Sequence, residues 1–401
     1  DFWKKENFCG DRENIDSVLE ALCKRVYDQG YAIEHRHFVK GGKEVYLIND
    51  FDNNIILRKI SHDIKKIYRI QTRSRDSIIS QVISLLKDGS SFSVVRTDIK
   101  SFFESIPIYK TLNKIERDGL ISSKYVQLIK SLYKTEDEKY NLRRGFCASS
   151  VLSEIYMRQI DNKIRLLDGI YYYNRFVDDI IIFSTSDPLA LLSKIKEILG
   201  PELTINKDKT SITAFPCDIH QAKGYDSHKK CKINACPNKT KEINYLGYRF
   251  TVPCLSTPKN TERSIQITLS KNKIKKIKTR IAKAFIQYAS DKDTEILIKR
   301  IMFLTSNVKI PSNNRTGYIM TGLFFLYPVL TDPPKSLNEL DTFLKKCINC
   351  SRNAFHGNGF ISDTNRMTLN KLSFTGGYVN KICHKLSYKQ LCQIGECWKH
   401  V

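Results

Sequence analysis

The stretch from Ile170 to Ser184 constrains the fold of this chain more than any other. Two apolar runs rich in β-branched and aromatic residues flank the adjacent acids Asp178 and Asp179. This pattern predicts a β-hairpin with two carboxylates at its tip. Neighbouring like charges raise each other's pKa and destabilise the fold unless a cation binds there. An exposed Asp-Asp turn is the alternative interpretation, because aspartate is a favoured turn residue.

The overall charge indicates the kind of partner. The 401 residues include 66 basic and 42 acidic side chains, a net charge of +24. Such a balance favours a polyanionic partner, most often nucleic acid. We expect no membrane association, since no apolar run approaches the ~20 residues of a spanning helix and no signal or lipidation motif stands out. Twelve scattered cysteines favour reduced thiols and a cytoplasmic location.

A second acid follows another apolar run. The segment 91–98 predicts a strand that ends at Asp98, which either caps the next helix or serves as a metal ligand that the hairpin tip could meet. Helical periodicity is found at 15–29, 76–87, 108–118, 123–134, in a helix that follows Ser150, and at 189–199 and 271–288. Strands are predicted at 44–48, 54–57, 203–205 and 265–269, and at 243–250 with an interruption at Gly247, where another backbone is expected to come close.

Several basic residues are candidates for phosphate binding. Arg73 and Arg75 could bind a phosphate through two guanidinium bonds each, or belong to a solvated face. Arg144 and Gly145 precede a helix, which suits close approach of the backbone to a polyanion, although a plain loop would look similar. The solvent face of the 271–288 helix has no acid before Asp291 and favours phosphate binding. Its cations include Lys271, Lys275 and Lys278.

Cysteine and histidine residues offer a weaker metal hypothesis. Five of them cluster in the polar insertion 217–240, but their spacing matches no established zinc finger. They are Cys217, His220, His228, Cys231 and Cys236. For Cys347 and Cys350 we expect buried thiols, because no second pair lies at a standard distance.

Five segments in order resemble the motif set of reverse transcriptases over roughly residues 65–250. They are the strand ending at Asp98, Arg144-Gly145 with its helix, Phe176-Val177-Asp178-Asp179, Asn206 to Lys209, and Tyr245 to Tyr248. The wording from Arg144 to Met157 is similar to the prokaryotic abortive-infection and defence-associated branch. Most of the family has Gln immediately before this Gly, and often Pro before the Gln. Here Arg144 and Arg143 occupy these two positions, and the difference concerns how the template strand is bound.

The resemblance implies an α+β, right-hand polymerase fold with fingers, a ferredoxin-like palm built on an antiparallel sheet, a helical thumb and a helical C-terminal region. The implied domains are an N-terminal region with fingers at 1–90, a palm with inserted fingers elements at 91–253, a thumb at 254–335 and a helical extension at 336–401. The implied activity is synthesis of DNA from dNTPs by two-metal phosphoryl transfer.

The resemblance also assigns roles to residues. Two Mg²⁺ ions, with Mn²⁺ as a substitute, would be held by Asp98, Asp178, Asp179 and the carbonyl of Ile99. Lys209 would approach the leaving pyrophosphate, although a solvated turn lysine is the alternative. Phe103 would exclude a ribose 2′-hydroxyl. The other nucleotide-binding candidates are Arg73, Arg75, Arg144 and Gly145, and the primer and template candidates are Leu246, Gly247, Tyr248, Lys271, Lys275 and Lys278.

The implied setting is antiphage defence in the bacterial cytoplasm. The partners would be a non-coding RNA as template or scaffold, the cDNA product, and further copies of the chain or a second defence component. Two alternatives stay open: an RNA-binding scaffold with a polymerase fold but no essential synthesis, and a reverse transcriptase like those of group II introns. A viral-type RNA polymerase would share the palm, but Phe103 argues against ribonucleotides.

Overall fold

The computed structural model falls into two compact units. The first comprises residues 1–82 and 90–229, and the second comprises residues 83–89 and 230–401. The structure describes residues 12–28, 30–133, 140–215, 240–254, 262–311, 318–350 and 361–398. The boundaries of the four predicted domains remain predictions.

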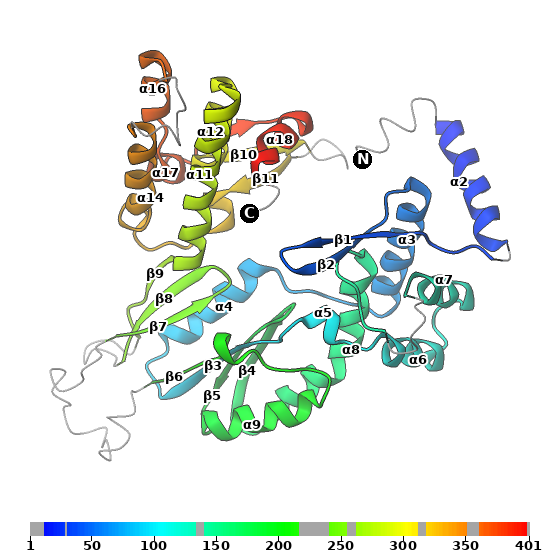
Figure 1. Cartoon of the computed structure of the whole chain (residues 1–401). Coiled ribbons are helices and arrows are strands. Elements are labelled where there is room, and N and C mark those ends of the chain that lie inside the picture. The colour runs from blue at the N-terminus through cyan, green and yellow to red at the C-terminus, as the bar shows by residue number, and fades with distance from the viewer. Residues whose placement is uncertain are drawn as a thin grey trace, which may run out of the picture. The chain divides into compact units, whose positions relative to one another are not determined.

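A four-stranded antiparallel sheet forms the centre of the first unit (Figure 1). Its strands are β3 (Phe92–Asp98), β4 (Ile170–Phe176), β5 (Asp179–Ser184) and β6 (Ser211–Phe215), in the order β4-β5-β3-β6. Helix α8 (Cys147–Arg165) precedes β4, and α9 (Pro188–Leu199) lies between β5 and β6. This β-α-β-β-α-β arrangement is ferredoxin-like, and it confirms the α+β class and the antiparallel palm sheet.

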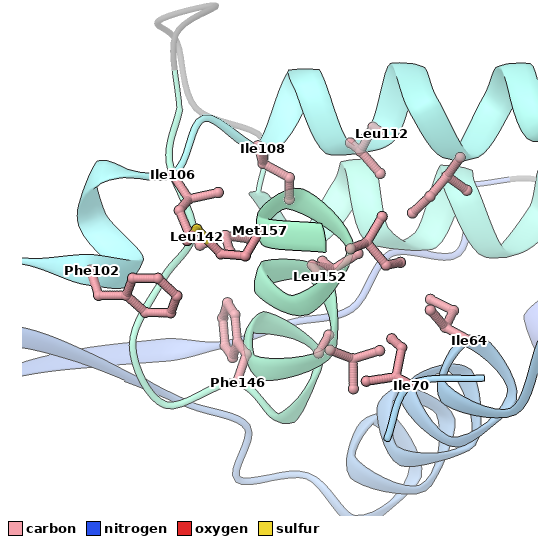
Figure 2. Packing of buried hydrophobic residues seen from close by; sticks show 14 of the residues in the cluster. Ile64, Ile70, Phe102, Ile106, Ile108, Leu112, Leu142, Phe146, Leu152 and Met157 are labelled. Carbon is pink, nitrogen blue, oxygen red and sulfur yellow. The ribbon is translucent and has the colours of Figure 1, made fainter. Parts of the chain in front are cut away.

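The first unit contains further helices and strands outside this sheet. The helices are α2 (Arg12–Tyr27), α3 (Phe51–Ile67), α4 (Arg75–Lys87, whose last turn belongs to the second unit), α5 (Phe102–Ser105), α6 (Ile108–Asp118) and α7 (Ser123–Tyr133), and the strands β1 (Arg36–Lys40) and β2 (Lys43–Leu47) form a hairpin. Figure 2 shows Leu112 of α6, Leu152 and Met157 of α8 and Ile64 of α3 in one buried cluster. The cluster fixes α6 and α3 against α8, the helix that leads into the hairpin β4–β5.

The strand predicted at 54–57 is wrong, because these residues lie inside α3. The Asp50 side chain caps this helix by accepting a hydrogen bond of 2.8 Å from the Asn53 amide. Burial then recurs at helical spacing through Ile56, Ile60 and Ile64. A short apolar run has no periodicity that separates a strand from a helix, and the helical environment decides.

The second unit carries two small sheets among helices. One sheet contains β7 (Thr240–Tyr245), β8 (Tyr248–Pro253) and β9 (Gln266–Leu269), and the other has the order β11-β10-β12 with β10 (Asn307–Pro311), β11 (Tyr318–Gly322) and β12 (Cys383–Lys385). The helices are α11 (Lys271–Asp291), α12 (Thr294–Thr305), α13 (Leu323–Leu326), α14 (Pro333–Ile348), α16 (Asp363–Asn370), α17 (Phe374–Val379) and α18 (Tyr388–Gly395). A sheet therefore accompanies the helices predicted for the C-terminal region.

The single interrupted strand predicted at 243–250 is a hairpin instead. Leu246 and Gly247 form the two-residue turn between β7 and β8, with φ angles of 44° and 83°. Positive φ at both central positions is what a tight hairpin turn requires. Gly247 therefore marks a reversal of the chain rather than an interruption within one strand.

Two other predictions concern thiols and membranes. Cys347 is buried, and burial raises the pKa of its thiol to about 11, while Cys350 is half-buried and both are free. The cysteine and histidine residues of the 217–240 insertion lie outside the described residues. In the part of the chain that the structure describes, no helix is long and apolar enough to cross a membrane.

Candidate active site

The three predicted acids come together where β3 meets the β4–β5 hairpin. Asp98, the last residue of β3, pairs in register with Asp179, the first residue of β5. The backbone amide of Ile99 donates a hydrogen bond of 3.1 Å to the carbonyl of Asp178. Residues 80 positions apart in the sequence therefore share one end of two neighbouring strands, which is the arrangement that a joint cation site requires.

The turn that presents Asp178 is strained. Val177 and Asp178 connect β4 to β5, and Val177 has a φ of 60°, which is unusual for a β-branched residue. The Nη1 of Arg175 donates a hydrogen bond of 2.9 Å to the Val177 carbonyl and holds the turn. Such strain persists only where surrounding contacts determine the conformation, as they often do at functional sites.

Arg175 also ties the hairpin to α8. Its Nη2 lies 2.7 Å from Glu154 Oε2 and 2.9 Å from Asp161 Oδ2, and the side chain is only 3% exposed. Burial acts to lower the pKa of Arg175, but the bonds to Asp161 and Glu154 outweigh it and raise the pKa, so the guanidinium stays charged. This role was not predicted from the sequence, in which Arg175 stands out only as a cation in a mainly apolar strand.

The electrostatics of Asp178 indicate a site that attracts a cation. Burial, followed by the charges of Asp98 and Asp179, raises the pKa of the half-buried Asp178 carboxyl, while Lys209 acts in the opposite direction. A positive ion beside Asp178 would relieve this repulsion.

Protein cations engage the other two acids. Asp98 is buried and accepts hydrogen bonds from Lys209 Nζ at 2.9 Å and from Asn206 Nδ2 at 3.3 Å. Asp179 accepts one of 3.0 Å from Arg96 Nη2. Lys209 thus lies against a predicted metal ligand, and its contact with a leaving pyrophosphate remains a prediction. The sequence analysis did not assign roles to Arg96 or Asn206.

The residues present fit a magnesium site that substrate completes. Within the described residues, no group of three or more His, Cys, Asp or Glu side chains is arranged to hold a metal. Asp98 is bound to Lys209 and Asp179 is bound to Arg96, whereas Asp178 forms no ion pair with the described residues. Mg²⁺ uses one or two carboxylates and otherwise water and phosphate oxygens, so Asp178 and Asp98 would suffice, and an ion held by both would replace Lys209 as the partner of Asp98. The hydrogen bond from its amide to the Asp178 carbonyl places Ile99 beside the acids. Coordination of a metal ion by the Ile99 carbonyl remains a prediction.

The structure gives another reason for the glycine at 145. A Cβ built on Gly145, whose φ is 108°, would lie 2.1 Å from the carbonyl oxygen of Tyr46. The close approach at this position is therefore to strand β2 of the same chain. The neighbouring Arg144 forms an ion pair of 3.1 Å with Glu104. Binding of nucleotide by Arg144 and Gly145 remains a prediction.

The remaining nucleotide candidates belong to the first unit. Phe103 is half-buried at the start of α5, and its ring centroid lies 5.3 Å from that of Phe102. Arg73 donates a hydrogen bond of 3.0 Å to Gln81. Arg75 is half-buried at the first position of α4.

The primer and template candidates belong to the second unit. Tyr248 is fully buried beside Tyr327, with ring centroids 5.0 Å apart, so its side chain packs in the protein. Lys271 and Lys275 are exposed on α11, and Lys278 pairs with Glu339 at 2.6 Å. Leu246 and Gly247 form the β7–β8 turn.

A ferredoxin-like sheet with acids at the meeting point of β3 and β5 defines a polymerase-type palm. Residues 52–250 match the family model described as reverse transcriptase (RNA-dependent DNA polymerase). The chain therefore contains a reverse transcriptase domain, which is a nucleotidyltransferase domain. None of the curated proteins compared with the chain matches it.

Solved telomerase structures are similar to this chain at low identity. The apo telomerase of Candida tropicalis truncated from its C-terminal domain has 13% identity and a TM-score of 0.37, with 63% of this chain and 60% of that chain covered. The telomerase of Candida albicans in complex with a TWJ fragment of telomeric RNA has 10% identity and a TM-score of 0.39, with 96% and 65% covered. This chain thus spans less than two thirds of the length of either structure.

Proposed function

We propose that this chain is an RNA-directed DNA polymerase that joins dNTPs at Asp98 and Asp178. The observation that supports it most is the pairing of Asp98 with Asp179 and the bond from Ile99 to Asp178. These contacts bring carboxylates from distant segments to one point, within a domain that matches the reverse transcriptase family.

Each residue of the site would have a separate role in the reaction. Divalent ions, when bound, activate the 3′-hydroxyl and neutralise the leaving group, and Asp98 and Asp178 would hold them. Asp179, bonded to Arg96, would keep the start of β5 in register. Lys209 is our candidate for contacting the pyrophosphate, because its side chain is 53% exposed although it is bonded to Asp98. Phe103 would select deoxynucleotides.

Incorporation of labelled dNTPs and NTPs by the purified protein with its co-purifying RNA tests this function. We expect dNTP incorporation that needs Mg²⁺ or Mn²⁺ and that disappears in Asp178→Asn. Asp168→Asn is the matched control, because Asp168 is exposed at the base of the same hairpin. Preference for NTPs, or full activity in Asp178→Asn, would overturn the proposal.

For the biological setting, we infer antiphage defence in the bacterial cytoplasm. The support is the similarity of the stretch from Arg144 to Met157 to the defence-associated branch. The partners would be a non-coding RNA and either further copies of the chain or a second defence component. Plaque counts on bacteria that carry the gene, its Asp178→Asn variant or an empty vector test this, and counts with the gene equal to those with the empty vector would contradict it.

A scaffold without essential synthesis is the second candidate. It is favoured by one observation, the engagement of Asp98 with Lys209 and of Asp179 with Arg96, which satisfies two acids without a metal. The same assay separates the two functions, because a scaffold would protect bacteria equally well with Asp178→Asn.

A further inference from the structure

A basic pocket lies between α6 and the C-terminal half of α8. Its volume is about 600 Å³, and its described lining residues include one carboxylate and four cations, Lys110, Lys114, Arg117 and Lys163. Such a pocket has a net positive charge and room for part of a phosphate-bearing chain.

The pocket lies on the opposite side of α8 from the catalytic hairpin. Glu154 and Asp161 lie on one face of α8, and both bind Arg175 of that hairpin. Residues of an α-helix are about 100° apart, which places Gln159 and Lys163 roughly 140–180° around the axis from Glu154. A ligand in the pocket would therefore not enter the active site.

Two of the cations form no close ion pair. Lys110 pairs with Glu202, and Lys114 pairs with Asp118 at 3.1 Å. Among the described residues, Arg117 and Lys163 form no such pair, although the charge of Arg117 acts on the neighbouring Asp118 carboxylate. The exposed Lys163 has the charge most available to an anion from outside the protein.

A buried hydroxyl in the pocket wall also lacks a partner. Thr111 lines the pocket and is 1% exposed, and its Oγ1 has no hydrogen-bond partner among the described residues. A buried polar group left unsatisfied destabilises a protein, so this hydroxyl marks an imperfectly packed wall beside the cations.

The spacing of the cations favours a strand over a single small anion. Lys110, Lys114 and Arg117 follow one face of α6, and seven residues of helix span about 10 Å. Phosphates of one strand in a duplex are about 3.4 Å apart along the axis, so roughly three of them match this row. Lys163 provides a cation from the opposite wall.

We propose that this pocket binds the sugar–phosphate backbone of a nucleic-acid strand at a second site, separate from the active site. The proposal goes beyond the polymerase function and does not depend on it. Binding here would keep one part of a nucleic acid on the protein while another part occupies the palm.

Fluorescence anisotropy with the full chain and oligonucleotides of one sequence, as RNA and as DNA, tests the proposal without nucleotides. In the double variant Arg117→Gln/Lys163→Gln we expect binding at least about tenfold weaker, and a slope of log affinity against log salt smaller by about 1.4, at about 0.7 per lost phosphate contact. Equal loss for RNA and DNA indicates backbone binding, and greater loss for RNA adds recognition of the 2′-hydroxyl. Both results support the proposal.

The control is Lys194→Gln/Lys196→Gln, which removes the same charge from exposed positions on α9. If both double variants bind alike, the proposal is overturned. It is also overturned if AMP or inorganic phosphate displaces the strand from the wild-type protein at strand-like concentrations. The pocket would then be a small-anion site.

A second variant guards against misfolding. Lys163→Gln changes a single exposed side chain of the pocket, so we expect unchanged thermal stability with strand binding about threefold weaker. Wild-type affinity in this variant contradicts the proposal. The binding measurements use no nucleotides and no incorporation step, so failure of the polymerase proposal and failure of this one are distinguishable.

Discussion

At the scale of single residues, Arg175 determines where the acids are presented. It joins the strained Val177 carbonyl to two acids of α8 through hydrogen bonds of 2.7 to 2.9 Å. A guanidinium suits this task because its donors form a fixed planar fork. The position of Asp178 therefore depends on a residue that does not itself touch the reacting groups.

We expect Arg175→Ala to lower the free energy of unfolding by roughly 3–5 kcal/mol, because it leaves buried carboxylates without a counter-charge. Equilibrium unfolding in urea measures this. The control is Arg165→Ala, which removes an exposed cation at the end of α8 that lies over the Tyr173 ring, and for which about 1 kcal/mol or less is expected. Similar small losses in both variants would contradict the structural role of Arg175.

The sequence predicted the acids but not the residues that hold them. The apolar runs around Asp178 and before Asp98 indicated strand ends, because alternation and length are local signals. The partners of Arg175 lie on a helix more than ten residues earlier, at Glu154 and Asp161. No local pattern contains that pairing, since only the packing of α8 against β4 creates it.

At the scale of elements, the hairpin β1–β2 is attached to the loop before α8. The Tyr46 amide donates a hydrogen bond of 2.8 Å to the Arg144 carbonyl, and the Arg143 guanidinium lies 4.7 Å from the Tyr46 ring centroid. Gly145 allows this approach because it has no Cβ. The loop between Arg143 and Gly145 thus positions an exposed hairpin.

We expect Gly145→Ala to lower the free energy of unfolding by roughly 2–4 kcal/mol, because a Cβ would overlap the Tyr46 carbonyl in addition to straining φ. Exchange of the Tyr46 amide hydrogen should accelerate. Gly119→Ala is the control, since its φ is also positive, at 62°, but nothing lies within 4 Å of the added Cβ, so about 1 kcal/mol is expected. An unchanged exchange rate at Tyr46 in Gly145→Ala would show that the hairpin is not held there.

At the scale of the whole molecule, the net charge of +24 predicts salt-sensitive binding of nucleic acid. We expect affinity for an RNA–DNA hybrid to fall at least about tenfold between about 50 and 200 mM salt, because bound phosphates release their counterions. Titrations at several salt concentrations measure the slope. An affinity independent of salt would mean that the basic residues do not contact phosphates.

The strand ending at Asp98 and the β4–β5 hairpin were predictable, but β6 and the pairings of the second unit were not. The strand predicted at 203–205 is wrong, because only an isolated bridge forms at Ile205 and β6 begins at Ser211. The palm sheet follows from strands whose apolar runs stand out, such as Ile180 to Phe183, all fully buried. In the second unit, β10 pairs in parallel with β12, matching Asn307 to Cys383. The three residues of β12 are too few to carry a periodic signal, so only long-range packing reveals that sheet.

The most direct test of the account is dNTP incorporation by Asp98→Asn, Asp178→Asn and the double variant, each checked for folding by circular dichroism. Groups that act as one site show strongly non-additive losses. We predict that each single variant loses at least about 100-fold in rate and that the double variant is no worse than the weaker single variant. Wild-type activity in either single variant, or losses that multiply in the double variant, would contradict a shared site.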